Sequence, residues 1–109
     1  MTNTETTKAE ETDIDRAKKL VDLLIADGFN LWLFPEDDTS SPMHKNTQDA
    51  EAVKNDINAC DMMMLQACKG PIGARFILVF GNGDDGPISN YTDNEMAEHY
   101  YEQVMGHLL

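Results

Sequence analysis

One stretch of the chain constrains its fold more than any other: the apolar run over residues 75–80, which leads into the polar segment 81–86. The run consists of Arg-Phe-Ile-Leu-Val-Phe, and such near-continuous apolar character is typical of a strand inside a sheet. The polar segment contains Asn-Gly and Asp-Gly, two dipeptides that favour tight turns. We therefore expect residues 74–80 to form the central strand of a sheet and residues 81–87 to turn away from it.

Adjacent segments predict the neighbours of this strand. Residues 62–68 are expected to form a second strand, which a hairpin turn at residues 69–73 joins to the central one. Residues 88–91 are expected to add a short pairing at the edge of the sheet.

Residues 29–34 predict a further strand, which Pro35 ends. Its side chains alternate between two faces, and both faces carry large apolar groups. One face has Phe29, Leu31 and Leu33. The other face has Trp32 and Phe34, so either both faces are covered or these two residues form an exposed patch for contact with another molecule.

Helical spacing of apolar residues predicts helices between and around the strands. The first is expected to begin at Thr12 and to end at Gly28, since glycine can take the left-handed conformation common at helix ends. The second follows the polar loop 36–46 and is expected to be capped by Asn46 or Thr47. Its expected inner residues are Ala50, Val53 and Ile57.

The last helix has the clearest sequence pattern. The segment 92–95, Thr-Asp-Asn-Glu, matches a capping box. The residues expected on the inner face are Met96, Ala97, Tyr100, Tyr101, Val104, Met105 and Leu108. Glu95, Glu98 and Glu102 are expected to lie together on the opposite side.

These elements predict an α+β fold with the order α-β-α-β-β-α. The sheet is expected to have three strands, or four if residues 88–91 pair, to be mainly antiparallel, and to carry helices packed on it. Residues 1–11 have almost nothing apolar and are predicted to be a disordered tail. Residues 12–109 then form a single domain, which suits a chain of 109 residues.

Charge is the strongest compositional signal. Twenty Asp and Glu stand against eight Lys and Arg, for a formal net charge of −12. Direct binding of nucleic acid or of an anionic membrane surface is not expected, because both require cations on the protein. A basic partner suits the sign, although acidic charge also keeps a small protein soluble.

Motifs of catalysis are absent from the sequence, which has no Gly-x-Ser-x-Gly elbow, Walker loop or dinucleotide fingerprint. We therefore expect neither an enzyme nor a cofactor. An EF-hand count from Asn82 places Pro87 where glycine is needed and Asp93 at the twelfth position, so the calcium interpretation fails. His99, among the glutamates of the last helix, has too few companions for a zinc site. No metal site is expected.

Compartment is inferred from the cysteines and the N-terminus. Cys60 and Cys68 do not form a Cys-x-x-Cys unit and suit a reducing compartment. The N-terminal residues lack the apolar segment of a signal peptide, and no stretch is long enough to span a membrane. We expect a cytoplasmic location in the host cell.

Beyond Arg75 the chain has no Lys or Arg. The acidic residues of this part are expected to form a surface of one sign, which speeds encounter with basic partners. The predicted partner-binding residues are Asp84, Asp85, Asp93, Glu95, Glu98 and Glu102.

Two short motifs carry a resemblance. Residues 78–83, Leu-Val-Phe-Gly-Asn-Gly, and residues 88–94, Ile-Ser-Asn-Tyr-Thr-Asp-Asn, resemble a group of small uncharacterised proteins encoded by bacteriophages, prophages and plasmids. The helix, strand and acidic turn over residues 20–38 are similar to the same group. The chain departs from it at Asn90, where the group has Asp, and at residues 35–36, where it has Asp-Gly.

The resemblance implies an accessory protein of a phage or mobile element that binds host machinery. The leading hypothesis is a protein–protein inhibitor of a host nucleic-acid-binding defence complex, of the anti-CRISPR or anti-restriction type, whose acidic face imitates the charge of DNA. Its partner would be a basic host protein or nucleoprotein complex. One alternative is a structural module that forms oligomers, such as a homodimer, through Trp32 and Phe34. A second is a metal or small-molecule binder that uses the turn at residues 82–86.

Overall fold

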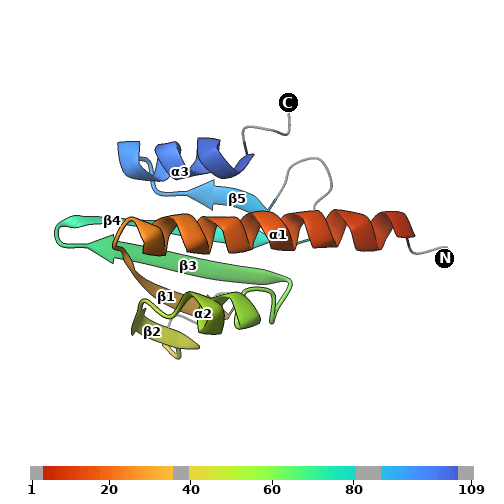
Figure 1. The fold of residues 1–109 in the computed structure, drawn as a ribbon, viewed down its shortest axis with the longest axis horizontal. Helices are drawn as coiled ribbons and strands as arrows, with labels where there is room; N and C mark the ends of the chain where they lie inside the picture. The colour runs from red at the N-terminus through yellow and green to blue at the C-terminus, as the bar shows by residue number, and fades with distance from the viewer. Residues whose placement is uncertain (1–3, 36–39, 81–86, 106–109) are drawn as a thin grey trace.

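The computed structural model describes residues 4–35, 40–80 and 87–105. Within these ranges the chain forms three helices and five strands (Figure 1). Their order is α1 (Thr4–Ala26), β1 (Asn30–Pro35), β2 (His44–Thr47), α2 (Ala50–Asp56), β3 (Met62–Lys69), β4 (Ile72–Val79), β5 (Ile88–Tyr91) and α3 (Glu95–Met105).

The strands pair antiparallel in one sheet of order β2-β1-β3-β4-β5. The α+β fold class expected from the sequence is confirmed, as is the pairing of residues 88–91 with the strand before them. The prediction that residues 74–80 form the central strand is wrong, because β3 occupies the middle of the sheet. The reason is β2, which pairs outside β1 and makes five strands where three or four were expected, so that two strands flank β3 on each side.

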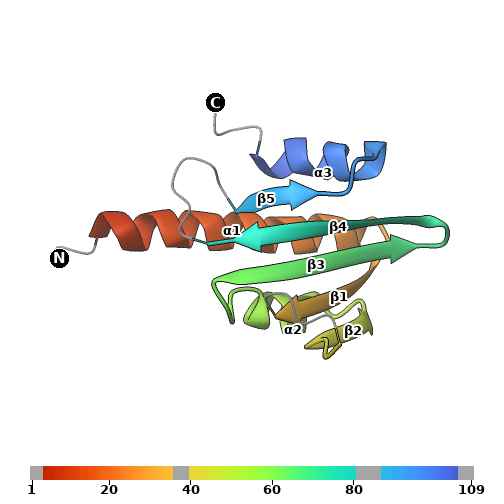
Figure 2. The same ribbon diagram turned by 180° about the vertical axis from the view of Figure 1, so that it is seen from behind.

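One face of the sheet forms the hydrophobic core with the helices. Leu33, Leu65 and Phe76 lie opposite one another across β1, β3 and β4, and each is fully buried. Side chains from α1, α2 and α3 join them in a single cluster of buried residues. In Figure 1 α1 crosses in front of the strands, and in Figure 2 it lies behind them.

The opposite face carries the alternate residues of the same strands. Phe34, Met64 and Ile77 lie in one row across β1, β3 and β4, and none of them belongs to the core cluster. Figure 2 shows the strands on this side with α1 behind them. In the described part of the chain, this face of the sheet therefore carries no helix. The apolar run of β4 is therefore near-continuous because its alternate side chains lie in the core and on the face without a described helix, and not because helices cover both faces.

The first helix is longer than its sequence pattern indicated. It begins at Thr4, so residues 4–11 are helical and not the disordered tail that was expected. The segment Lys-Ala-Glu-Glu at residues 8–11 has high intrinsic helix propensity, which outweighs its lack of apolar periodicity. The end of the helix follows the prediction, since Gly28 takes a φ of +93° just beyond Ala26.

A short strand and a different cap replace part of the expected loop between β1 and α2. β2 forms in the segment predicted as a polar loop, and its four residues have no apolar alternation that could have announced it. α2 is capped by Asp49, whose carboxylate accepts a hydrogen bond from the Ala52 amide. The predicted cap, Thr47, instead accepts a bond from the Asp49 amide. The expected inner residues are confirmed: Val53 and Ile57 are fully buried, and Ala50 is half-buried.

α3 also has a cap that differs from the expected one. The side-chain oxygen of Asn94 accepts a hydrogen bond of 2.8 Å from the Ala97 amide, which is the geometry of an N-cap. Thr92, the predicted cap, pairs with β4 instead, where its hydroxyl accepts a bond from the Arg75 amide. Leu108, expected on the inner face, lies outside the described residues.

Among the described helices, none has both the length and the apolar character that crossing a lipid bilayer demands.

Candidate functional site

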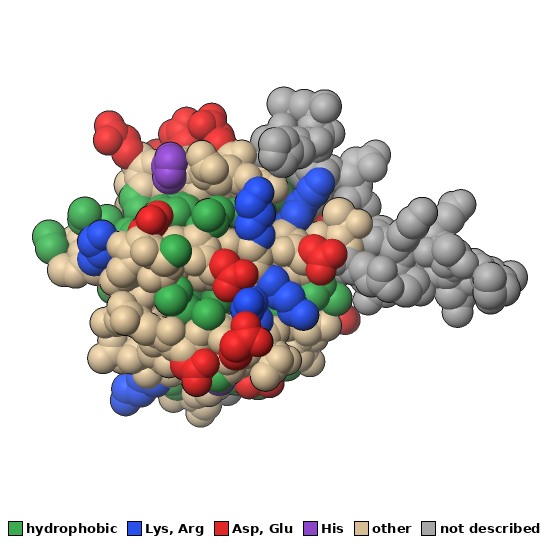
Figure 3. Space-filling view, in the orientation of Figure 1, with side chains coloured by type: hydrophobic (Ala, Val, Ile, Leu, Met, Phe, Trp, Pro, Cys, Tyr) green, Lys and Arg blue, Asp and Glu red, His purple; other side chains and the backbone are tan. Residues whose placement is uncertain are grey.

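The outer side of α3 presents a surface of one charge sign. Ala97, Tyr100 and Val104 point into the core, so the helical period places the glutamates on the opposite side. We define the acidic surface as the exposed residues Asp93, Glu95, Glu98 and Glu102. Figure 3 shows acidic side chains gathered along its upper edge, where α3 lies. Asp84 and Asp85, predicted to belong to the same surface, lie outside the described residues.

The carboxylates of the acidic surface have no cationic partner among the described residues. The ion pairs of that part of the chain join Lys54 to Asp22 and Glu51, and His44 to Asp56. All of them lie on α1, β2 and α2. The charge of the acidic surface is therefore not neutralised from within, and it faces solvent.

Two stacked tyrosines border the acidic surface. The rings of Tyr91, on β5, and Tyr101, on α3, lie 4.7 Å apart at an angle of 24°. Desolvation raises the pKa of Tyr91 above its ordinary value, and the negative charges of Glu98, Asp93 and Glu102 raise it further. The contribution of these carboxylates to the raised pKa of Tyr91 reflects the negative charge that surrounds the tyrosine pair.

Such a combination suits guanidinium and ammonium groups. Carboxylates form charge-assisted hydrogen bonds with them, and the face of a tyrosine ring attracts a cation. An arginine is the better match, because its planar group can stack on an aromatic ring while it binds a carboxylate.

The sheet face on which no described helix lies (Figure 2) is a second surface of interest. Trp32 on this face is half-buried, whereas Phe34 has only 7% of its area exposed. The expectation of an exposed patch formed by both residues is therefore wrong for Phe34. It packs instead in the row with Met64, its neighbour on β3, which is also 7% exposed.

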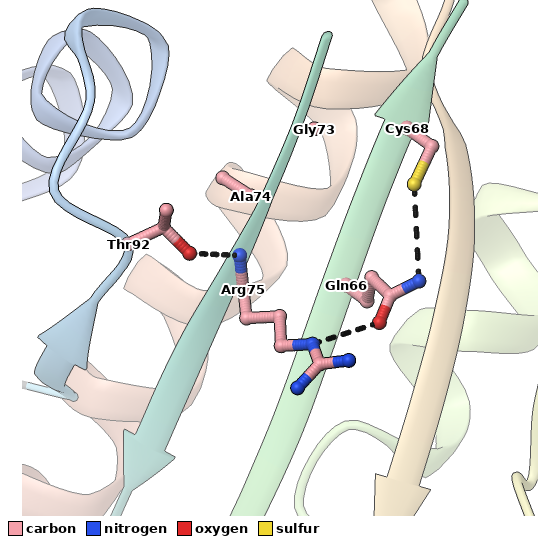
Figure 4. A pocket seen from close by; sticks show the side chains of 6 residues that line it. All are labelled: Gln66, Cys68, Gly73, Ala74, Arg75 and Thr92. Atoms are coloured by element: carbon pink, nitrogen blue, oxygen red, sulfur yellow. Dashed lines mark hydrogen bonds between the residues drawn. The ribbon is translucent and has the colours of Figure 1, made fainter. Parts of the chain in front are cut away.

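A neighbouring row on the same face contains Trp32, Gln66 and Arg75, followed by Thr92 just beyond β5. Beside this row lies a hollow of about 420 Å3 (Figure 4). The Arg75 side chain donates a hydrogen bond from Nε to Gln66 Oε1 at 3.0 Å. Gln66 Nε2 in turn donates to Cys68 Sγ at 3.8 Å.

Sequence reasoning missed this row. Its signal was present, because Gln66 and Arg75 interrupt two otherwise apolar strands and each sits on the face opposite the core. Recognising it required the register between the strands, which brings these two residues directly opposite each other.

A second hollow, of about 470 Å3, lies between the end of α1, the β3–β4 hairpin and the start of α3. Three of the polar residues that line it, Asp27, Lys69 and Tyr100, form hydrogen bonds within the fold. The Tyr100 hydroxyl donates to the Asp27 carboxylate, and Lys69 Nζ donates to the Asp27 carbonyl at 2.7 Å. The same ammonium lies 5.3 Å from the centre of the Phe29 ring.

The described residues form neither a metal site nor a site for thiol chemistry. No group of three or more His, Cys, Asp or Glu side chains there could hold a metal ion. Cys60 and Cys68 are free and half-buried. The His99 ring meets the Tyr100 ring edge-on at 5.0 Å. The turn at residues 82–86, the basis of the binder hypothesis, lies outside the described residues.

Comparison with known proteins gives no match: no family model, no curated protein and no solved structure is similar to this chain.

Proposed function

We propose that the chain is a protein-binding module that uses its acidic surface to occupy a basic surface of a partner protein. The observation that carries the proposal is the exposed row of carboxylates on α3, which have no cationic partner within the described part of the chain. Charges that face solvent without internal partners remain available to a molecule of opposite sign.

The net charge of −12 supports the same choice of partner. A field of this sign accelerates the approach of basic proteins and repels nucleic acids and anionic membranes. The stacked pair Tyr91 and Tyr101 adds flat aromatic area beside the carboxylates, and tyrosine and arginine are both enriched in binding hot spots.

A basic surface that ordinarily binds nucleic acid is the partner we favour. Glu95, Glu98 and Glu102 are three and four residues apart, so they follow one another at about 4.5 and 6 Å along the helix axis. Phosphates of one DNA strand succeed each other at about 3.4 Å along the duplex axis. The helix therefore offers a line of charge of the same sign and of comparable spacing. If the short motifs at residues 78–83 and 88–94 mark a protein of a phage or plasmid, the partner we propose is a host defence complex of the CRISPR or restriction type.

The test begins with capture of bound proteins from a bacterial lysate at low salt, followed by purification of the captured partner and measurement of its affinity. We expect affinity to fall steeply as salt increases, because exposed charges are screened within about 10 Å at 0.1 M salt. Nucleic acid should compete with the chain for the partner. The triple variant Glu95→Gln, Glu98→Gln, Glu102→Gln should bind at least about tenfold more weakly, as expected for the loss of rim and hot-spot charges.

A matched control changes the same number of carboxylates elsewhere. Asp15, Glu51 and Asp61 are exposed on other parts of the chain, and replacing them with Asn, Gln and Asn removes an equal charge. If this control weakened binding as much as the α3 variant, net charge alone would explain the affinity and the acidic surface would not be the binding site.

A further inference from the structure

Arg75 is an exposed cation whose binding capacity is only partly used. Its Nε donates to Gln66 Oε1, and in Figure 4 the two terminal nitrogens of its guanidinium group carry no dashed line. Within the described part of the chain, these nitrogens form no hydrogen bond or ion pair. The planar end of the group, which can hold two acceptor atoms at once, is therefore open.

Among the described residues, no carboxylate lines the hollows beside Arg75. The hollow of about 420 Å3 is lined by Gln66, Cys68, Gly73, Ala74, Arg75 and Thr92. An adjoining hollow of about 240 Å3 also includes Arg75 and Thr92, and its other lining residues are Ile77, Asn90 and Tyr91. In a chain with twenty acidic residues, the described residues that line both hollows beside this cation carry no negative charge. An acidic group from outside meets no carboxylate among these described lining residues.

The neighbours of Arg75 hold it in place for such a ligand. Gln66 fixes the guanidinium through Nε, and the Gln66 amide is itself held by Cys68. The Arg75 backbone amide donates to Thr92 Oγ1 at 2.9 Å, which ties β4 to the end of β5. Gly73 lines the hollow without a side chain, and a Cβ at this position would lie 3.3 Å from the Ala67 carbonyl oxygen and 3.4 Å from Cys68 Sγ. A cation that is already oriented loses less side-chain entropy when it binds.

The rest of this sheet face has the composition of a protein interface. Trp32 lies in the same row as Arg75, and the half-buried Ile77 lies in the next row. Aromatic residues, Met and Arg are enriched at the centres of interfaces, where Lys, Glu and Asp are depleted. The hollow is open to solvent along one side of a sheet, whereas sites for small molecules enclose most of their ligand. A polypeptide that brings both apolar side chains and one carboxylate suits the face better than a free organic acid.

We propose that the part of this sheet face around Arg75 is a second docking surface, on which Arg75 binds the carboxylate of an Asp or Glu side chain from an extended segment of a partner polypeptide. The guanidinium group and the carboxylate form a bidentate pair. On either side of it, apolar side chains of the partner segment pack against Trp32 and Ile77. This contact does not depend on the acidic surface of α3, which uses other residues and a partner of opposite charge.

The segment should be neutral apart from this one carboxylate, because the net charge of −12 repels strongly acidic chains at long range. A suitable probe is the blocked peptide acetyl-Leu-Ala-Glu-Ala-Leu-amide. In an extended peptide the leucines point to the same side as the glutamate, because side chains alternate along the backbone. Its matched control replaces Glu with Gln and changes nothing else.

The experiment is an NMR titration of the full chain labelled with nitrogen-15. We expect the Glu peptide to shift the signals of Arg75 Nε–H, the Gln66 side-chain amide and the Thr92 amide. The Gln peptide should bind about tenfold more weakly, since the charge-assisted pair is lost. The absence of these shifts with the Glu peptide, or equal affinity for both peptides, would overturn the proposal.

Variants distinguish the effect of the planar guanidinium group on binding from the effect of a positive charge alone. Arg75→Gln should abolish the preference for Glu over Gln, and Arg75→Lys should retain only a small part of it, because an ammonium cannot form the planar pair. Lys45→Gln removes the same charge from exposed β2 and should leave binding unchanged. Unchanged binding in Arg75→Gln would contradict the assignment.

Two further measurements distinguish the source of the carboxylate. Acetate and succinate should bind at least tenfold more weakly than the Glu peptide, and equal affinity would identify a site for small organic acids instead. Sedimentation should show a monomer for both the natural chain and Arg75→Gln. A dimer that Arg75→Gln dissociates would make a second copy of the chain the occupant and overturn the choice of partner.

Discussion

The hydroxyl group of Tyr100 on α3 donates a hydrogen bond to the carboxylate of Asp27, the residue that follows α1. The ring of Tyr100 is buried and meets the Phe29 ring edge-on at 5.9 Å. These contacts fix the middle of α3 against the end of α1, the longest described helix. Because they lie beneath the acidic surface and not in it, they can be changed without removing any of its charges.

Replacing Tyr100 with Phe should lower the free energy of unfolding by about 1–2 kcal/mol, because a hydrogen bond to a charged group is lost while the ring remains. Urea denaturation followed by circular dichroism measures the change. The companion Asp27→Asn keeps an oxygen that can accept the bond and should cost less. A Tyr100→Phe variant as stable as the natural chain would show that the bond adds nothing to the fold.

Stability should depend on pH through the same residue. Burial raises the pKa of Tyr100 above its ordinary value of 10.0, and the hydrogen bond to Asp27 and the charge of Asp27 raise it further. The folded chain therefore holds the phenol proton more tightly than the unfolded chain. The resulting stabilisation is complete below pH 10.0 and is lost as the pH rises above that value.

The measurement compares the natural chain with Tyr100→Phe one pH unit below and one pH unit above 10.0. We expect the difference in unfolding free energy between the two chains to shrink at the higher pH, since other titrating groups are common to both. A difference that stayed constant or grew would contradict the predicted direction of the pKa shift.

The cap of α3 gives a third prediction. Asn94→Ala should destabilise the chain by about 1–2 kcal/mol, because the Ala97 amide loses its acceptor. Asn94 Nδ2 also donates to the Gly73 carbonyl at 3.0 Å, and this bond is lost as well. Asn94→Asp keeps the acceptor and loses only the second bond, so thermal unfolding should rank it between the natural chain and Asn94→Ala. If the two variants were equally unstable, the cap would not be the main contribution.

The two faces of the sheet should respond differently to truncation. Leu65→Ala removes a fully buried side chain from the core and should cost about 2–5 kcal/mol. Ile77→Ala, on the face without helices, removes a half-buried side chain and should cost about 1 kcal/mol. Denaturant unfolding of both variants tests the assignment of faces. A larger cost for Ile77→Ala would mean that the second face is covered as closely as the core.

Apolar periodicity predicted most of the fold because the spacing of apolar residues along the sequence reflects which side chains are buried. The alternation of Leu31 and Leu33 placed β1 correctly, and the spacing of Val53 and Ile57 placed α2. β2 could not be predicted in this way, since its residues contribute no side chain to the core cluster and it is held by backbone pairing to β1. Its existence depends on a partner strand that local sequence cannot specify.

The caps were misplaced for a related reason. Both Thr92 and Asn94 can cap a helix, and the choice is made by tertiary contacts: Thr92 is already bound to the Arg75 amide of β4. Of the candidate sites, the exposed glutamates of α3 followed from the helical period alone. The Arg75 hollow did not, because it depends on Gln66 and Thr92, which strand pairing brings together from distant positions.

The sheet ends on both sides in a strand of only four residues, β2 and β5, whereas β3 and β4 have eight each. At the β5 edge, the Tyr91 amide is already bound to the Asn90 side chain. Few backbone groups are thus exposed for another chain to pair with, and short edges of this kind protect a sheet from growing by strand addition. The molecule can therefore present broad side-chain surfaces to partners, while its short edge strands leave few backbone groups through which copies of the chain could polymerise.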